Sequence, residues 1–229
     1  MGIIQVAEPG TGGGEAQSDE IPIYYTKGGS PHYLIDCTKR YTPRCSRLFP
    51  EVPIPNGAYA SADKDHHASV ILRSQGQTYE YDFWEFNCPP NTGRQHGKCI
   101  GTTTPVRGGG TVLVSYGGAC NANSYADAGT CTGSAIAAGV PPQAGVLDPR
   151  ALSAGPIKHV LYVAIGCPNG HFVWPAHVAD GYPKNCQVPG GPPEGKRIWL
   201  DLTDSAIGRL SDPRWAKVIL HAMHHYGFF

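Results

Sequence analysis

The sequence predicts a mainly β protein, a jelly-roll or β-sandwich with a C-terminal amphipathic helix and short helical segments, stapled by disulfide bonds. The 229 residues include 30 Gly and 21 Pro, and only 16% are charged, which favours short strands joined by tight turns. The stretch TYEYDFWEF (78–86) has the length and aromatic content of a strand. Eight cysteines enclose four turn-rich loops, which indicates a disulfide framework.

The N-terminal part of the chain is expected to hold a tail, an edge strand and a turn. Residues 1–20 are Gly-rich and polar, so we expect a flexible tail there, followed by a single domain over residues 21–229. IPIYYT (21–26) is predicted to be an edge strand, because its proline lacks the backbone N–H that a central strand would use. The dipeptide Asn56-Gly57 predicts a turn in an otherwise extended segment.

Two strands are predicted to pair as a hairpin in the middle of the chain. ASVILRS (68–74) and the stretch 78–86 are both strand-like, and Gln75-Gly76 between them suits a tight turn. A further strand is predicted in TVLVSYGG (111–118). The small residues that follow, with an Asp-Pro dipeptide starting at 148, predict one or two short helices.

The C-terminal part is expected to continue the sheet and to end in a helix. The nearly continuous apolar run IKHVLYVAIGC (157–167) predicts a central strand, with HFVWPA (171–176) pairing to it as a hairpin. A last strand is predicted at 196–202. The final segment, SDPRWAKVILHAMHHYGFF, has the period of an amphipathic helix, with Ser211 or Asp212 as its cap.

The cysteines form four couples that are close in sequence. Their even number and the Gly, Pro and Asn between them argue for four sequential disulfides and an oxidising compartment, although eight cysteines allow 105 pairings. A zinc site is the alternative, but no CxxC pair is present. The N-terminus lacks a basic region followed by an apolar core, so we interpret it as a start from which the signal peptide has been removed. The predicted pairs are Cys37–Cys45, Cys88–Cys99, Cys120–Cys131 and Cys167–Cys186.

The stretch 78–86 carries three carboxylates. A period of two places Glu80, Asp82 and Trp84 on one face and Glu85 on the opposite, aromatic face. Because burial of a lone carboxylate is costly, we expect a β-bulge near Phe83 or Trp84 that turns Glu85 towards the other two. Two carboxyl groups roughly 5 Å apart are what a retaining glycosidase needs, and Asp82 between them would raise the pKa of a neighbour. The alternative is a half-solvated strand whose carboxylates face water.

EYDFWE (80–85) resembles the E-x-D-x-x-E signature of glycoside hydrolase family 16, whose members are secreted jelly-roll enzymes that cut β-glucans and galactans. The resemblance covers about six residues. It implies that Glu80 is the nucleophile, that Asp82 assists it and that Glu85 is the acid/base.

A wider similarity spans roughly residues 50–229. The stretches VPIPNGA, YDFWE, IKHVLYVAIGC, FVWPAHVADG and PPEGKRIWLDL, and a helix ending in HYGFF, are similar to uncharacterised secreted bacterial β-sandwich proteins. This similarity implies a common fold and a secreted location, and it brings no established activity.

Several acidic and histidine residues are candidates for a second site. Alternation puts Asp63, Asp65 and His67 on one side of an extended segment, where they would suit a structural calcium ion or a transition metal. Asp65 could instead orient His67 as a general base. His159 interrupts the apolar run 157–167 and is a second candidate base. A polar loop and a hydrogen-bonded core histidine are the alternatives, and no cofactor is expected to be required.

Aromatic side chains are candidates for sugar binding, because a flat ring can stack on the apolar C–H face of a sugar while the hydroxyl groups stay wet. We assign this role to Trp84, Trp174 and Tyr116, with ordinary core packing as the alternative. Trp199 and Trp215 are expected to lie in the core.

Two histidines on the predicted C-terminal helix are four residues apart. His221 and His225 could hold a metal ion, but the residue after His221 is not Glu, so the motif is not H-E-x-x-H. A solvated helix face is the interpretation that we favour for His221.

The formal net charge is zero and no basic stripe is present, so neither nucleic acid nor an anionic membrane is expected as a partner. We expect a secreted monomer that acts on polysaccharide. The leading hypothesis is a glycoside hydrolase that uses Glu80 and Glu85. The alternatives are a polysaccharide lyase with a His or Tyr base, such as His67 or His159, and a non-catalytic carbohydrate-binding or extracellular structural protein.

Overall fold

The computed structural model describes most of the chain from residue 21 onwards. The described residues are 21–27, 29–38, 49, 51–61, 66–87, 104–122, 131–145, 147, 149–163, 168–179 and 190–229. They divide between Pro141 and Pro142 into two compact units, here called the N-terminal unit and the C-terminal unit. The expectation of one domain over 21–229 stays a prediction, because two compact units can also be lobes of one folding domain.

The larger sheet of the N-terminal unit has five strands. Only β1 and β4 pair in parallel, and every other neighbouring pair is antiparallel, so the sheet is mixed. Its strands, in spatial order, are β1 (Ile23–Thr26), β4 (Ala68–Ser74), β5 (Gln77–Trp84), β7 (Tyr116–Asn121) and β8 (Cys131–Gly133).

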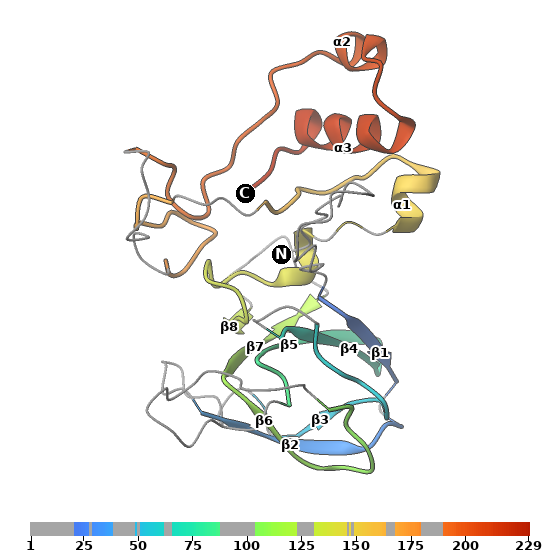
Figure 1. Cartoon of the computed structure of the whole chain (residues 1–229), viewed down its shortest axis with the longest axis vertical. Coiled ribbons are helices and arrows are strands. Elements are labelled where there is room, and N and C mark those ends of the chain that lie inside the picture. Colours follow the sequence, from blue (N-terminus) through green and yellow to red (C-terminus); the bar gives the residue numbers. More distant parts are fainter. Residues whose placement is uncertain are drawn as a thin grey trace, which may run out of the picture. The chain divides into compact units, whose positions relative to one another are not determined.

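A second, three-stranded sheet lies in the same unit (Figure 1). It has the order β3 (Val52–Pro53), β2 (His32–Cys37), β6 (Gly110–Val114), with β2 antiparallel to β3 and parallel to β6. The apolar core of the unit draws on both sheets, since one cluster joins Val70 and Phe83 to Ile35 and Val112. The protein is therefore mainly β with two mixed sheets and few helices, which confirms the coarse fold class.

The predicted hairpin and edge strand are confirmed. β4 and β5 pair from Ala68↔Phe83 to Ser74↔Gln77, and the turn is made by Gln75 and Gly76, both with positive φ. β1 is at the edge of its sheet, and β5 has a neighbour on each side. Alternate side chains of β5 point to the same face of the sheet, so Tyr81 and Phe83 both pack against the core. There the ring centroids of Phe83 and Phe49 are 5.4 Å apart.

Among its described residues, the C-terminal unit contains three α-helices, α1 (Pro149–Ala154), α2 (Asp204–Arg209) and α3 (Arg214–His225). The predicted amphipathic helix is confirmed as α3, whose Ala222 is buried and whose Val218 and Ile219 pack against Ile157 and Leu161. Its N-cap is Pro213, without a side-chain hydrogen bond, so the cap predicted at Ser211 or Asp212 is wrong. A 3-10 turn, Pro142–Gly145, precedes α1.

The strands predicted in this unit are wrong wherever the structure describes them. In 157–163 and 196–202 only single β-bridges occur, and both Leu161 and Ile198 bridge to Phe228. Phe172, expected to pair with the 157–167 run, bridges Glu194 instead. Residues 227–229, directly after α3, thus form backbone hydrogen bonds with both 157–163 and 196–202. These bonds hold the end of α3 beside the two segments.

The disulfide framework falls largely outside the described residues, which exclude Cys45, Cys88, Cys99, Cys167 and Cys186. Cys37 and Cys120 are disulfide-bonded. Cys120 lies opposite Cys131 in the β7–β8 ladder, a register that is compatible with the predicted pair. The four pairings themselves stay predictions.

Among the described residues, no helix is long and apolar enough to cross a bilayer.

Candidate functional site

The predicted carboxylate strand is present, but its side chains are not at a surface. Glu80 and Asp82 lie on the same face of β5, and each is 0% exposed. The Ser69 hydroxyl on β4 donates to Asp82 Oδ1 at 2.6 Å. A polysaccharide cannot reach a carboxylate that has no exposed surface, so this conformation does not favour Glu80 and Asp82 as a hydrolytic pair.

The electrostatics of this pair favour a shared proton. Burial and the neighbouring Glu80 carboxylate raise the pKa of Asp82 well above its usual range, and the Ser69 hydrogen bond opposes this only in part. Two ionised carboxylates contain no donor, so the side-chain hydrogen bond between Glu80 and Asp82, which also raises the pKa of Asp82, needs a proton on one of the two groups. Protonation of one carboxyl group supplies the missing donor, which is the usual outcome when like charges are buried together.

The backbone beside Asp82 is packed too closely for side chains. Gly118 lies opposite Asp82 in the β5–β7 ladder. A Cβ added at Gly118 would lie 2.3 Å from the carbonyl oxygen of Gly133, and one added at Gly117 would lie 2.1 Å from that of Asp82. The dipeptide Gly117-Gly118 is therefore required by the close approach of three backbone segments, and the carboxyl pair lies in a tightly packed region.

Glu85 does not join the strand, and the predicted β-bulge is wrong. The ladder is regular through Trp84↔Tyr116, β5 ends at Trp84, and Glu85 has a positive φ of 54°. Its side chain is buried and accepts a hydrogen bond from the Ser115 hydroxyl through Oε2. Glu85 is therefore buried without a bulge, and the hydrogen bond from Ser115 offsets part of the cost of burying its carboxylate.

The predicted bases are held by local hydrogen bonds. The N–H of His67 donates to the Ser61 hydroxyl at 2.7 Å, and the His67 carbonyl oxygen accepts from Ser61 N–H at 2.8 Å. His159 Nδ1 lies 2.8 Å from the carbonyl oxygen of Val160, which requires the proton on Nδ1 because a carbonyl only accepts. His159 belongs to the C-terminal unit. The predicted metal ligands Asp63 and Asp65 lie outside the described residues.

The predicted sugar-stacking residues differ in exposure. Tyr116 is buried and Trp84 is half-buried, and both pack in the N-terminal core cluster. Trp174 is 68% exposed, as ring stacking on a sugar requires. Trp199 is about half-exposed with the Arg197 guanidinium 4.7 Å from its ring centre, and Trp215 is also exposed, so the core positions predicted for them are wrong.

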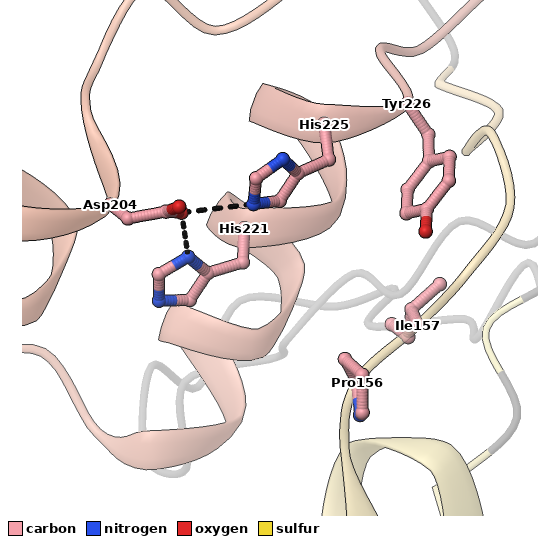
Figure 2. A pocket seen from close by; sticks show the side chains of 6 residues that line it. All are labelled: Pro156, Ile157, Asp204, His221, His225 and Tyr226. Atoms are coloured by element: carbon pink, nitrogen blue, oxygen red, sulfur yellow. Dashed lines mark hydrogen bonds and ion pairs between the residues drawn. The ribbon is translucent and has the colours of Figure 1, made fainter.

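A different group of side chains converges in the C-terminal unit. Asp204, His221 and His225 place their ligand atoms within 4.8 Å of one another. His221 Nδ1 lies 2.7 Å and His225 Nε2 lies 3.0 Å from the same oxygen, Asp204 Oδ1. Figure 2 shows both imidazole rings on one side of α3, directed at the carboxylate. This group is here called the Asp–His cluster.

The local sequence explains how the cluster is assembled. Spacing of four residues on α3 stacks the rings of His221 and His225, whose planes differ by only 12°. Asp204 is the first residue of α2, where the Thr203 hydroxyl caps the helix by accepting from Ala206 N–H at 3.2 Å.

Two further hydrogen bonds tie α2 and the segment before it to α3. Leu200 N–H donates to the Met223 carbonyl oxygen at 3.2 Å, and Lys217 Nζ donates to that of Gly208 at 2.8 Å. The carboxylate is therefore brought to the two histidines by backbone structure on both sides of it.

The cluster brings one carboxylate and two imidazole rings close together. Hydrogen bonding to His221 and the charge of the two imidazoles lower the pKa of Asp204, so its carboxylate is ionised. Each ring points one nitrogen at this carboxylate. One carboxylate oxygen and two imidazole nitrogens are a set of ligands that zinc and similar transition metals accept.

The Asp–His cluster forms one wall of a pocket of about 430 Å³. Tyr226, Pro156 and Ile157 line the rest of it. Figure 2 shows the Tyr226 ring beside His225, with its hydroxyl directed towards Ile157. The size is within the range of pockets that take small molecules.

Sequence reasoning missed Asp204 although a signal was present. Thr203-Asp204 is a typical helix start, with a capping hydroxyl followed by an acid in the first turn. The preceding segment 196–202 was assigned to a strand, which concealed the start of α2. His221 and His225 were recognised as a pair, but no third ligand was found for them.

No protein-family model, curated protein or solved structure matches this chain. The resemblances to family 16 and to secreted bacterial proteins therefore stay predictions, and any function has to be argued from the site itself.

Proposed function

We propose that the C-terminal unit binds a divalent transition metal ion, of which zinc is the best example, through Asp204, His221 and His225. The observation that carries this proposal is the convergence of three ligand atoms within 4.8 Å at the wall of a pocket. Two nitrogen ligands disfavour calcium and magnesium, which prefer oxygen.

The main alternative is an Asp–His pair that acts as a general base. A base of this kind needs one histidine, oriented through one nitrogen, with its other nitrogen facing the substrate. Here two imidazoles point at one carboxylate oxygen, from 2.7 and 3.0 Å. In a tetrahedral zinc site, ligand atoms are about 3.3 Å apart, so each of the two oxygen–nitrogen distances would lengthen by roughly 0.3–0.6 Å on binding. This favours the metal.

Zinc titration of the full chain followed by calorimetry tests the proposal. We expect one Zn²⁺ per chain, and we expect His225→Ala to weaken binding at least about ten-fold, because even loss of a residue that only supports a ligand costs 10–100-fold. His171→Ala is the matched control, an exposed histidine of the same unit outside the cluster. Equal zinc affinity in the wild type and His225→Ala would show that the cluster is not the site.

A polysaccharide-directed function is a second proposal, supported by the exposure of Trp174 and Phe172. Trp174→Ala should abolish retention of the protein on an insoluble glycan while its thermal stability stays nearly unchanged. Trp215→Ala, an exposed Trp on α3, is the control. Retention of Trp174→Ala equal to the wild type on every glycan tested would exclude this surface.

The finer parts of the fold and location predictions belong to the same proposal. A jelly-roll arrangement of the two sheets, four sequential disulfides and a secreted location would suit a glycan-binding protein. Hydrolysis by Glu80 would add an activity, and Glu80→Gln is its test. Full hydrolytic activity in that variant would eliminate Glu80 as a nucleophile.

A further inference from the structure

We infer that the pocket beside the Asp–His cluster takes a small carboxylate with an apolar body, bound to the metal through its oxygens. This inference rests on the proposed metal site and goes beyond it, because it names the class of ligand.

Charge is the first argument. The six residues that line the pocket include one charged group at neutral pH when the histidines are neutral, the Asp204 carboxylate. A divalent ion bound by one carboxylate and two neutral imidazoles leaves a net charge of about +1 at the site, since the metal is the largest local charge. A ligand with one negative charge neutralises it, whereas a second cation or a strongly anionic ligand does not.

Coordination is the second argument. The cluster offers three protein ligands, which is the number found in zinc sites that keep a position open for water or substrate. The cluster lies at the pocket wall and is open to solvent, because the side chains of Asp204 and His225 are each about half-exposed. An exogenous oxygen ligand can therefore complete the coordination from the pocket side.

The far wall of the pocket is the third argument. Pro156 and Ile157 present apolar surface, and Ile157 is fixed in a core cluster with Leu161 and Ala222. The Tyr226 ring lies next to His225, with centroids 6.4 Å apart, and its hydroxyl is directed towards Ile157 and away from Asp204 (Figure 2). A ligand with an acidic end and an apolar body fits these two walls better than an inorganic anion.

A carboxylate could come from a free organic acid or from a uronic acid unit of a glycan, and both present the same group to the metal.

Visible spectroscopy with Co²⁺ in place of zinc tests the inference on the full chain. We expect the Co²⁺ spectrum to change saturably on addition of benzoate, and not on addition of benzamide, which has the same shape without the charge. Glucuronate is the arm that represents a uronic acid, and a response to it but not to benzoate would identify the glycan source.

The outcomes separate the two proposals. Failure to take up Co²⁺ would overturn the metal site and this inference together. Uptake of Co²⁺ with a spectrum that neither benzoate nor glucuronate changes would overturn the inference alone, and so would an equal response to benzamide.

Discussion

Asp82→Asn is expected to stabilise this protein at neutral pH. The side chain is fully buried, Ser69 donates to its Oδ1 at 2.6 Å, and burial together with the neighbouring Glu80 carboxylate raises the pKa of Asp82. Asparagine keeps the acceptor for Ser69 and places an amide donor next to Glu80 without needing a proton from solvent. When the wild-type pair loses its shared proton, a buried group is left without a donor, which costs about 1–3 kcal/mol, and avoiding this loss is the expected gain in the free energy of unfolding at pH 7.

The effect should depend on pH with a definite sign. Because the pKa of Asp82 is raised in the folded state above its ordinary value of 3.8, the folded protein binds more protons than the unfolded chain between the two values. The free energy of unfolding then decreases as the pH rises. The contribution of Asp82 is fully present below the unfolded pKa and is lost as the pH rises through the folded pKa. The Asp82→Asn variant has no carboxyl group to ionise at this position. Its free energy of unfolding, relative to that of the wild type, should therefore increase from pH 4 to pH 7.

Urea unfolding followed by far-UV circular dichroism at pH 4, 5.5 and 7 measures this difference. For a chain of this size, each kcal/mol should also appear as about 2–4 °C in Tm. Asp36→Asn is the control, since Asp36 is exposed on β2 and the same formal charge is removed. A difference between Asp82→Asn and wild type that is the same at all three pH values, or a less stable variant at pH 7, would refute a proton-sharing carboxyl pair.

Two further predictions concern packing and the cluster. Gly118→Ala should cost about 3 kcal/mol in urea unfolding, the upper end of the range for overpacking, because its Cβ would meet the Gly133 carbonyl at 2.3 Å. Gly29→Ala, with open space around the added Cβ, should be near neutral, and equal effects would contradict the close approach. Thr203→Ala should weaken zinc binding several-fold in calorimetry, because a cap worth about 0.5–2 kcal/mol fixes the turn that carries Asp204, and Thr203→Ser should restore it.

The N-terminal unit could be predicted where the signal was local. The alternation in 68–84 and the Gln75-Gly76 turn are properties of adjacent residues, so β4 and β5 were placed with nearly correct bounds. The backbone conformation and burial of Glu85 could not be predicted in this way. It depends on the Ser115 hydroxyl, which lies 30 residues away in sequence, and on a backbone turn at a positive φ that a non-glycine residue rarely adopts.

In the C-terminal unit, local sequence was not enough to predict the secondary structure. The run 157–167 is apolar because it is buried, and apolar content alone does not separate a strand from an extended segment that packs against a helix. Within its described part, Leu161 is in the core with Ala222 of α3, and its backbone pairs only with residues 227–229. The sequence indicates that this segment is buried. It does not indicate the backbone hydrogen-bond partner that decides its secondary structure.

The location of the strongest site follows from the same distinction. A carboxylate on a central strand is a conspicuous sequence feature, yet the ladder that fixes Asp82 also buries it completely. The Asp–His cluster combines a histidine pair that any helical wheel reveals with an aspartate from a six-residue helix. Only the packing of α2 on α3 makes them neighbours. Chemistry that needs both convergence and access is therefore better supported at the end of α3 than on β5.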